Sequence, residues 1–394
     1  MRVRERGNLL IRGATVWTVG PRGILDRTDV LIKDGIIASL GPDLRGGDGE
    51  ELDGRGMVVT PGLIDVHTHV SLWEEGAPEA EGSGNEATNP VTPHLRVVDA
   101  INPRDRAFAE ARSGGVTMVQ ILPGSANVVG GQGAVVRTWG DTVEDMVRQA
   151  PSGMKAAFGE NPKNVYKGKN LWPSTRMGVA ACLRDALVGA ENYAAKVRGK
   201  KGPRERNLRD EALGALLRRE MPLRMHAHRA DDILTGLRIA EEFGLDYTLE
   251  HGTEGFLISS LLAAKGVRTA FGPAMTFRSK LELREAHIRN VVTLVRAGVP
   301  VALMTDHPVI PIGYLRNEAA ETIREGLSEE EALALVTRTA AAHLGLEARY
   351  GSLEEGKGGD AVLWSESPFS PRSVAVATVV DGVVAHRAQG DGRD

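Results

Sequence analysis

Short apolar, strand-like runs alternate with helix-like stretches from about residue 61 to residue 346. Short buried strands separated by helices are typical of parallel sheets, so this alternation constrains the fold more than any other feature. About eight such units predict an α/β fold, a closed (β/α)8 TIM barrel. The strand-like runs are Leu63–Val66, Val116–Leu122, Ala134–Val136, Met154–Phe158, Leu223–Met225, Tyr247–Leu249, Val267–Phe271 and Val299–Met304.

An open, doubly wound sheet is the structural alternative. Such a sheet would be expected to carry a Gly-rich phosphate-binding turn after its first strand. The first strand-like run here ends in His-Thr-His instead, which favours the barrel. The helix-like stretches between the strands include Glu282–Ala297 and Ser328–His343.

Both ends of the chain have a different, β-rich character. Short alternating runs are separated by turns such as Asp34-Gly35 and Asp381-Gly382, which are typical of hairpins. The simplest organisation is a small β-sandwich domain built from residues 1–60 and 347–394, with the barrel over residues 61–346.

Composition excludes several classes of protein. With 48 basic and 52 acidic residues the net charge is −4, which predicts no nucleic-acid partner and no membrane surface. Cys182 is the one cysteine, so an internal disulfide or a cysteine-rich metal site cannot form. No apolar stretch approaches the roughly 18 residues of a membrane span. We expect a soluble, cytoplasmic protein that acts on a small molecule.

The first strand of the predicted barrel ends in two histidines. His67 and His69 are two residues apart, so their side chains share one face of the strand. They stand at its carboxyl end, where the active sites of barrels lie. Two imidazoles converging there make half of a site for zinc or a similar metal; alone, they could equally be two histidines at a solvated strand end.

Three later strand-like runs also end in a histidine or an acidic residue. His226 and His251 follow two neighbouring strand-like runs, and Asp306 follows the last one. A barrel would bring all four strand ends together around one axis. Several imidazoles and one carboxylate make an open, catalytic metal site with room for water rather than a closed structural one.

These motifs also resemble a known family. The segments PGLIDVHTH, MHAH, LEHG and TDHP, in that order, are similar to those of the amidohydrolase superfamily, nearest its imidazolonepropionase-like branch, which includes some dipeptidases. Further matches are GVTMVQILPGSANVVGGQGAVV, GMKAAFGENPK, PSTRMG and GSLEEGKGGDAVLW, so the resemblance runs from about residue 8 to residue 386. The motifs identify the superfamily well and the substrate poorly.

The resemblance implies a role for each ligand. His67 and His69 would bind the more buried metal, and His226 and His251 a second metal, or they would complete a site with one metal. Asp306 would contact the metal and take the proton from the attacking water, so Asp306 and His251 are the predicted catalytic residues. The implied cofactor is one or two divalent ions, with zinc first and manganese or iron as alternatives, and a homodimer is a family-level expectation.

The ligand that bridges two metals is open between two residues. Members with two metals use a carboxylated lysine or a glutamate on a middle strand, and this chain offers Lys155 and Glu160 there. The two are five residues apart, so a regular strand would place them on opposite faces. Glu160 is slightly favoured because it stands at the carboxyl end, where a turn at Gly159 could aim it at the metals.

Four residues in the loops are candidates for substrate binding. Arg176 could hold a carboxylate with two hydrogen bonds, and Arg229, Asn161 and His228 stand beside the predicted ligands. Each of them could instead be a solvated or structural residue. The polar, Gly-rich stretch from Trp73 to Asn89 is a candidate lid.

The predicted reaction is hydrolysis of a C–N bond in an amide, a cyclic amide or a small peptide, rather than in ordinary proteins. Water bound to zinc ionises near neutral pH, which makes a nucleophile available. A ring deaminase on the same fold is one alternative, although Arg229 stands where such an enzyme would carry an acid or amide. A catalytically inactive barrel that serves as a scaffold is the other, and it would be expected to lose ligands.

Overall fold

The computed structural model describes residues 7–46, 48–78, 81–198 and 205–388. The outer ends of the two predicted β segments, residues 1–6 and 389–394, and residues 79–80 of the candidate lid lie outside this range. Among the described residues, every helix is too short or too polar to cross a membrane.

In the described part of the chain, seven buried strands, which pair in parallel within two sets, form the wall around the predicted site. Their residues are almost all buried, which explains why they read as continuous apolar runs in the sequence. They are β6 (Leu63–Thr68), β7 (Val116–Ile121), β11 (Met154–Ala157), β12 (Leu223–Ala227), β13 (Tyr247–His251), β14 (Thr269–Phe271) and β15 (Val301–Leu303). β6 pairs with β7, and β11 to β15 pair in chain order.

An antiparallel segment lies between β7 and β11. β8 (Val129–Gln132) pairs antiparallel with β11, and β9 (Ala134–Arg137) pairs antiparallel with β7 and with β10 (Val147–Gln149). The prediction that Ala134–Val136 is one of the parallel strands is therefore wrong. Its apolar run is the same for either direction, because burial, not orientation, determines that pattern.

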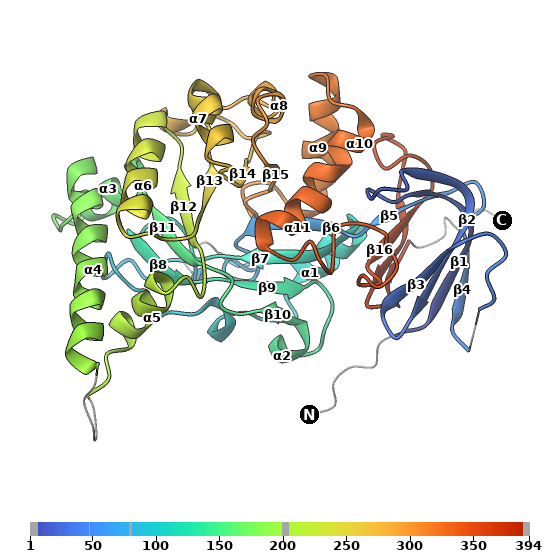
Figure 1. Cartoon of the computed structure of the whole chain (residues 1–394), viewed down its shortest axis with the longest axis horizontal. Helices are drawn as coiled ribbons and strands as arrows, with labels where there is room; N and C mark the ends of the chain where they lie inside the picture. Colours follow the sequence, from blue (N-terminus) through green and yellow to red (C-terminus); the bar gives the residue numbers. More distant parts are fainter. Residues whose placement is uncertain (1–6, 47, 79–80, 199–204, 389–394) are drawn as a thin grey trace.

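Helices follow most of the strands on the outside of the wall (Figure 1). They are α1 (Arg106–Ser113), α2 (Val143–Met146), α3 (Glu160–Gly168), α4 (Arg176–Val197), α5 (Leu208–Leu217), α6 (Ala230–Glu242), α7 (Ser259–Ala264), α8 (Arg289–Arg296), α9 (Leu315–Arg324), α10 (Glu329–Leu335) and α11 (Arg338–Leu344). Short 3-10 turns cover Val97–Asp99, Gly255–Ile258, Leu281–Leu283 and Ile312–Tyr314.

Two predicted helices differ in extent. The stretch Ser328–His343 is divided into α10 and α11, because the backbone leaves the helical region at Thr337 (φ −135°, ψ −91°). The helix expected from Glu282 begins only at Arg289. The carboxylate of Glu282 binds the backbone N–H of Glu160 and the side chain of Arg176 instead, so this segment is held as a loop.

Strands from both ends of the chain form one eight-stranded sheet. They are β1 (Leu9–Trp17), β2 (Ile24–Lys33), β3 (Ile36–Gly41), β4 (Glu50–Asp53), β5 (Val58–Pro61), β16 (Ala361–Trp364), β17 (Ala375–Val380) and β18 (Val383–Arg387). β16 pairs with β5 and so joins the two ends. Figure 1 shows this sheet at the opposite end of the molecule from α4 and α6.

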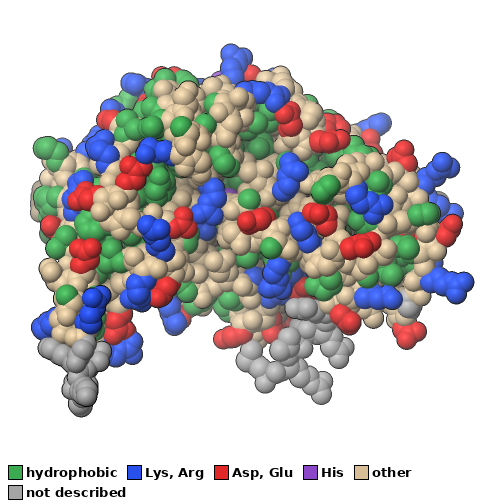
Figure 2. Space-filling view, in the orientation of Figure 1, with side chains coloured by type: hydrophobic (Ala, Val, Ile, Leu, Met, Phe, Trp, Pro, Cys, Tyr) green, Lys and Arg blue, Asp and Glu red, His purple; other side chains and the backbone are tan. Residues whose placement is uncertain are grey.

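A TIM-barrel-like α/β domain and a separate β domain are thus confirmed. Backbone hydrogen bonds from Asp306 N to His67 O (3.2 Å) and from His69 N to His307 O (2.8 Å) join the segment after β15 to the end of β6. A closed barrel, the β-sandwich packing and the domain limits at residues 60/61 and 346/347 stay predictions. On the face in Figure 2, acidic and basic side chains are interspersed, in keeping with the nearly balanced charge.

Candidate metal centre

The carboxyl ends of β6, β12, β13 and β15 meet, as the sequence predicts, and bring the histidines together. The ring of His251 lies 4.2 Å from that of His226, 4.7 Å from that of His228 and 5.0 Å from that of His67, between centroids. Residues from four strand ends, separated by long stretches of chain, therefore share one small volume.

Two groups of side chains in this volume could each hold a metal ion. The first is His226, His228 and His251, and the second is His67, His251 and Asp306; within each group the ligand atoms lie within 4.8 Å of one another. His251 belongs to both groups. His69 is adjacent to the second group, because its Nε2 lies 3.2 Å from Oδ1 of Asp306.

Each of the five imidazoles has a partner at its Nδ1 atom, so Nε2 is the atom that would bind a metal. This is the usual arrangement of metal-binding histidines, since a partner on one nitrogen fixes the ring and the tautomer. Among the described residues, Nε2 of His228 and of His251 has no hydrogen-bond partner although both are buried. The Nδ1 partners are Glu250 for His67 (2.8 Å), Leu122 O for His69 (2.7 Å), Ser125 for His226 (2.9 Å), Thr253 for His228 (2.8 Å) and Gly272 O for His251 (2.9 Å).

A divalent cation would supply the missing partner of these buried nitrogens. Burial lowers the pKa of His67 to about 4 and holds the pKa values of His226, His228 and His251 well below the usual range. All four imidazoles are therefore neutral at pH 7, which is the form that binds metal. The residues fit the metal that the sequence motifs imply.

Asp306 supplies the negative charge of the centre. Burial acts to raise its pKa, but hydrogen bonding to His69 and the neighbouring imidazoles of His251 and His67 lower the pKa below its ordinary range. Both Asp306 and His251 have left-handed backbones, with φ of 53° and 73°. Such a conformation is uncommon outside glycine.

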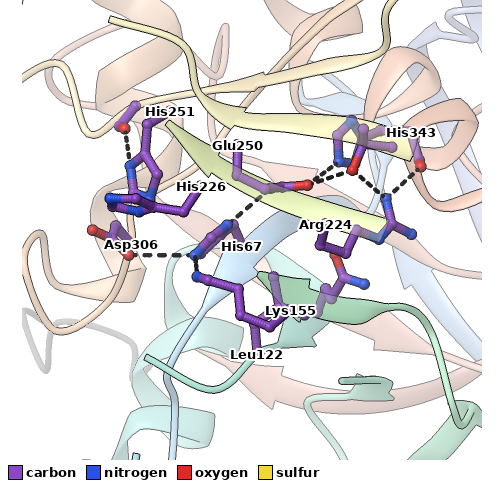
Figure 3. A network of polar contacts seen from close by, with 12 residues as sticks. His67, Leu122, Lys155, Arg224, His226, Glu250, His251, Asp306 and His343 are labelled. Atoms are coloured by element: carbon purple, nitrogen blue, oxygen red, sulfur yellow. Dashed lines mark hydrogen bonds and ion pairs between the residues drawn. The ribbon is translucent and has the colours of Figure 1, made fainter. Parts of the chain in front are cut away.

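Glu250 contacts the predicted ligand His67, a contact that the sequence analysis did not predict. Its carboxylate accepts from Nδ1 of His67 (2.8 Å) on one side and lies 3.2 Å from Nε2 of His343 on the other (Figure 3). Glu250 and His251 are neighbours, so strand alternation would point them to opposite faces. The left-handed backbone at His251 breaks that alternation, and both side chains contribute to the centre.

Lys155 lies at the centre, and Glu160 does not contact it. Nζ of Lys155 is 3.0 Å from Nε2 of His67, and burial lowers the pKa of this amine to about 8 (Figure 3). The turn expected at Gly159 exists (φ 85°), but it starts helix α3 at Glu160. Among the described residues no contact joins the carboxylate of Glu160 to a histidine, so the geometry favours Lys155 over Glu160 as the bridge.

The four candidate substrate residues divide into two pairs. His228 and Asn161 line the cavity at the centre, and Nδ2 of Asn161 is 3.3 Å from Nε2 of His226. Arg176 is instead paired with Asp232 (3.0 Å) and Glu282 (2.7 Å), and Arg229 with Asp231 (2.9 Å). Neither arginine lines the cavity, because nearby carboxylates already occupy their guanidinium groups.

The cavity above the histidines has a volume of 590 Å³, which suits a small molecule. Trp73 and Asn85, from the candidate lid, line one part of it. Met275, Phe277 and Lys280, from the loop that follows β14, line another part. This loop was missed, because nothing in its sequence shows that it turns over the strand ends.

Comparisons with known proteins agree with this arrangement. The model of the amidohydrolase family matches residues 102–386. The imidazolonepropionase of Rhizorhabdus wittichii is 30% identical over 345 residues, which cover 80% of this chain and 81% of that protein. The amidohydrolase tasK of Hapsidospora irregularis is 27% identical over 95% of this chain, although the chain spans only 42% of that longer protein.

A solved structure resembles the whole chain. The crystal structure of an amidohydrolase from Thermotoga maritima superposes with a TM-score of 0.93 at 44% identity, over 96% of this chain and 100% of that one. An adenosine deaminase from Xanthomonas campestris with bound zinc, at 17% identity and a TM-score of 0.56, shares the fold alone. Sequence, fold and the family model thus agree that the chain belongs to the amidohydrolase family, whose members are hydrolases that act on C–N bonds.

Proposed function

We propose that the chain hydrolyses the C–N bond of a small amide, cyclic amide or peptide at a centre of one or two divalent metal ions. The observation that carries the proposal is the convergence of five buried imidazoles and Asp306; all of these groups except His67 line one cavity. Zinc is the first candidate because it prefers imidazole and carboxylate ligands and an open catalytic geometry, and manganese or iron are alternatives.

The ligand assignment follows from the two groups of donors. His67, His69, His251 and Asp306 would hold one ion, and His226 with His251 or His228 the other. Lys155 would bridge them after its neutral amine adds CO2 to form a carbamate with release of a proton. The low pKa of the buried amine favours this reaction, because the neutral amine is the nucleophile.

When bound, the metal supplies Lewis-acid activation of a water molecule and of the scissile carbonyl. Asp306 accepts a proton from the attacking water, and the same carboxyl passes that proton to the leaving nitrogen as the C–N bond breaks. If His226 and His251 hold the second ion, His228, which lines the cavity and whose Nε2 has no partner among the described residues, would donate a hydrogen bond to the oxygen that becomes negative. The products are a carboxylic acid and an amine.

Asp306→Asn tests the mechanism. The amide keeps the size of the side chain and an oxygen for the metal but cannot take the proton, so kcat should fall by about 100-fold or more while the metal content is retained. Steady-state kinetics on a panel of N-acyl amino acids, dipeptides and cyclic amides, with metal analysis of the same samples, measures both quantities. A fully active Asp306→Asn protein would rule the mechanism out.

A ring deaminase and an inactive scaffold are the two alternative functions, and each predicts a different experimental result. A ring deaminase would release ammonia from an amino-substituted ring; Arg229, paired with Asp231 outside the cavity, offers no acid to assist it. An inactive scaffold would bind no metal. One to two equivalents of metal in the purified protein support the enzyme, and none supports the scaffold.

We propose that the strands around the site close as a barrel, with residues 129–137 as an antiparallel element between β7 and β11. The backbone bonds between the ends of β6 and β15 support closure on the other side. Residues 61–346 would then form the catalytic domain, and both chain ends a β domain packed beside it.

A further inference from the structure

The loop between β14 and α8 is fixed at both ends above the metal centre. At its start, the buried carboxylate of Glu318 accepts hydrogen bonds from the backbone N–H groups of Ala274 (3.2 Å) and Met275 (3.0 Å). At its end, Glu282 is paired with Arg176 (2.7 Å). The residues between these anchors therefore have a defined position relative to the cavity.

Between the anchors, one residue brings a positive charge to the cavity. Among the described residues that line it, Lys280 is the only lysine or arginine. Its Nζ donates to Oδ1 of Asn161 (2.9 Å), and Nδ2 of the same amide lies 3.3 Å from Nε2 of His226. The side chain of Asn161 therefore links Lys280 to His226 of the predicted metal centre.

The ammonium group of Lys280 has unused binding capacity. A lysine has three N–H donors, and the contacts of the described residues account for one, to Asn161. The side chain is half-buried, so a second partner there would be held in a partly water-free environment, where a charged hydrogen bond is strong.

The rest of the loop is apolar and open. Met275 is 47% exposed and Phe277 is 78% exposed, yet both line the cavity. Exposed large apolar side chains at the mouth of a polar site are typical of surfaces that a ligand covers. Trp73 and Leu283 add apolar surface to the same cavity.

We propose that Lys280 is the specificity residue of this site and binds a single carboxylate of the substrate. The substrate would place its scissile C–N bond at the histidines, its carboxylate on Lys280 and an apolar group against Met275 and Phe277. One cation matches one carboxylate, whereas a phosphate would be expected to meet several. This assignment of substrate class, an N-acyl amino acid or dipeptide with an apolar side chain, rests on the proposed function.

Binding of ligands without a C–N bond tests Lys280 separately from hydrolysis. The zinc-loaded protein is titrated by calorimetry with 4-phenylbutanoate and with 4-phenylbutan-1-ol, which differ only in the anionic group. The carboxylate should bind about tenfold more tightly or better than the alcohol. Because the zinc also attracts a carboxylate, Lys280→Met should reduce this preference by about tenfold rather than remove it, and Lys280→Arg should keep it.

Two further variants serve as controls. Lys167→Met removes the same charge from an exposed position on α3 and should leave the preference unchanged. Lys280→Gln can still donate to Asn161 but carries no charge, so it should show the same reduction even if Lys280→Met fails to fold. A preference that is undiminished in Lys280→Gln, or that is absent from the unmodified protein, would overturn the proposal, because the carboxylate would then bind elsewhere or not at all.

Hydrolysis assays distinguish a failure of the assignment of Lys280 from a failure of the proposed reaction. N-acetyl-L-leucine and N-(3-methylbutyl)acetamide share one amide bond and differ by the carboxylate. If neither is hydrolysed, this result counts against the proposed reaction for this class of amide, and the binding result still decides the role of Lys280. If both are hydrolysed equally well, Lys280 does not select the substrate, and the inference fails while the proposed reaction stands.

Discussion

The contacts of Lys155 make a prediction at the scale of single residues. If Lys155 bridges two metals, Lys155→Met should lower the metal content by about one equivalent and abolish most activity, because a carboxylate ligand is lost. Glu160→Gln should leave the metal content unchanged, since its carboxylate contacts no histidine. Elemental analysis after dialysis measures both variants. The reverse outcome would restore Glu160 as the bridge.

The sequence was most informative where a side chain ends an apolar strand. His67, His226, His251 and Asp306 were predicted in this way, because parallel strands bring their carboxyl ends to one place. Residues whose role depends on tertiary contacts were not predictable. Ser125 and Lys280 lie in loops whose course no local pattern reveals, and Arg176 is a possible carboxylate clamp in sequence but an ion-pair partner of Asp232 and Glu282 in the fold.

At the scale of elements, Arg176 connects three of them. From the start of α4 it binds Asp232 on α6 and Glu282 in the loop that carries Lys280. The helix-like sequence stretches Met177–Val197 and Ala230–Phe243 match α4 and α6 to within one residue. The pattern extended α8 too far toward Glu282, since a sequence does not show which partners a carboxylate will find in the fold.

Arg176→Met should therefore loosen the loop rather than remove a substrate contact. Amide hydrogen exchange of residues 273–285 should accelerate by about tenfold, as expected for the loss of one or two half-buried ion pairs. KM should rise for carboxylate and neutral substrates alike. Arg184 lies on α4 like Arg176 and forms an exposed pair with Glu242 of α6, so Arg184→Met is the matched control. If hydrogen exchange is unchanged and activity falls only with carboxylate substrates, Arg176 binds the substrate carboxylate directly instead.

At the scale of the whole molecule, buried histidines set the acid limit of stability. Burial lowers the pKa of His67 and of His307 to about 4, from an ordinary value of 6.5. The unfolded chain therefore binds protons before the folded one, and the stability present above pH 6.5 is lost as the pH falls toward 4. Thermal melting of the metal-free protein should therefore show a Tm that falls as the pH is lowered from 7 to 4.

The variant His307→Gln tests the sign of this effect. Glutamine takes up no proton, so the fall in Tm with acid should be shallower than in the unmodified protein. Burial raises the pKa of Asp65 and of Glu318 to about 7, and their contribution acts in the opposite direction, since it is lost as the pH rises from their ordinary values of 3.8 and 4.5 toward 7. A fall in Tm that is equally steep in His307→Gln and in the unmodified protein would contradict the burial of a neutral imidazole at residue 307.

The pairing of β5 with β16 has a consequence for biosynthesis. β5 ends at Pro61 and β16 begins at Ala361, so a ribosome that makes about 5–20 residues per second needs roughly 15–60 s to supply the partner strand. During that time β1 to β5 would emerge with an open edge at β5, a template for pairing with other nascent chains. The β domain would thus be the last part of the protein to mature, and the part most dependent on chaperones during translation.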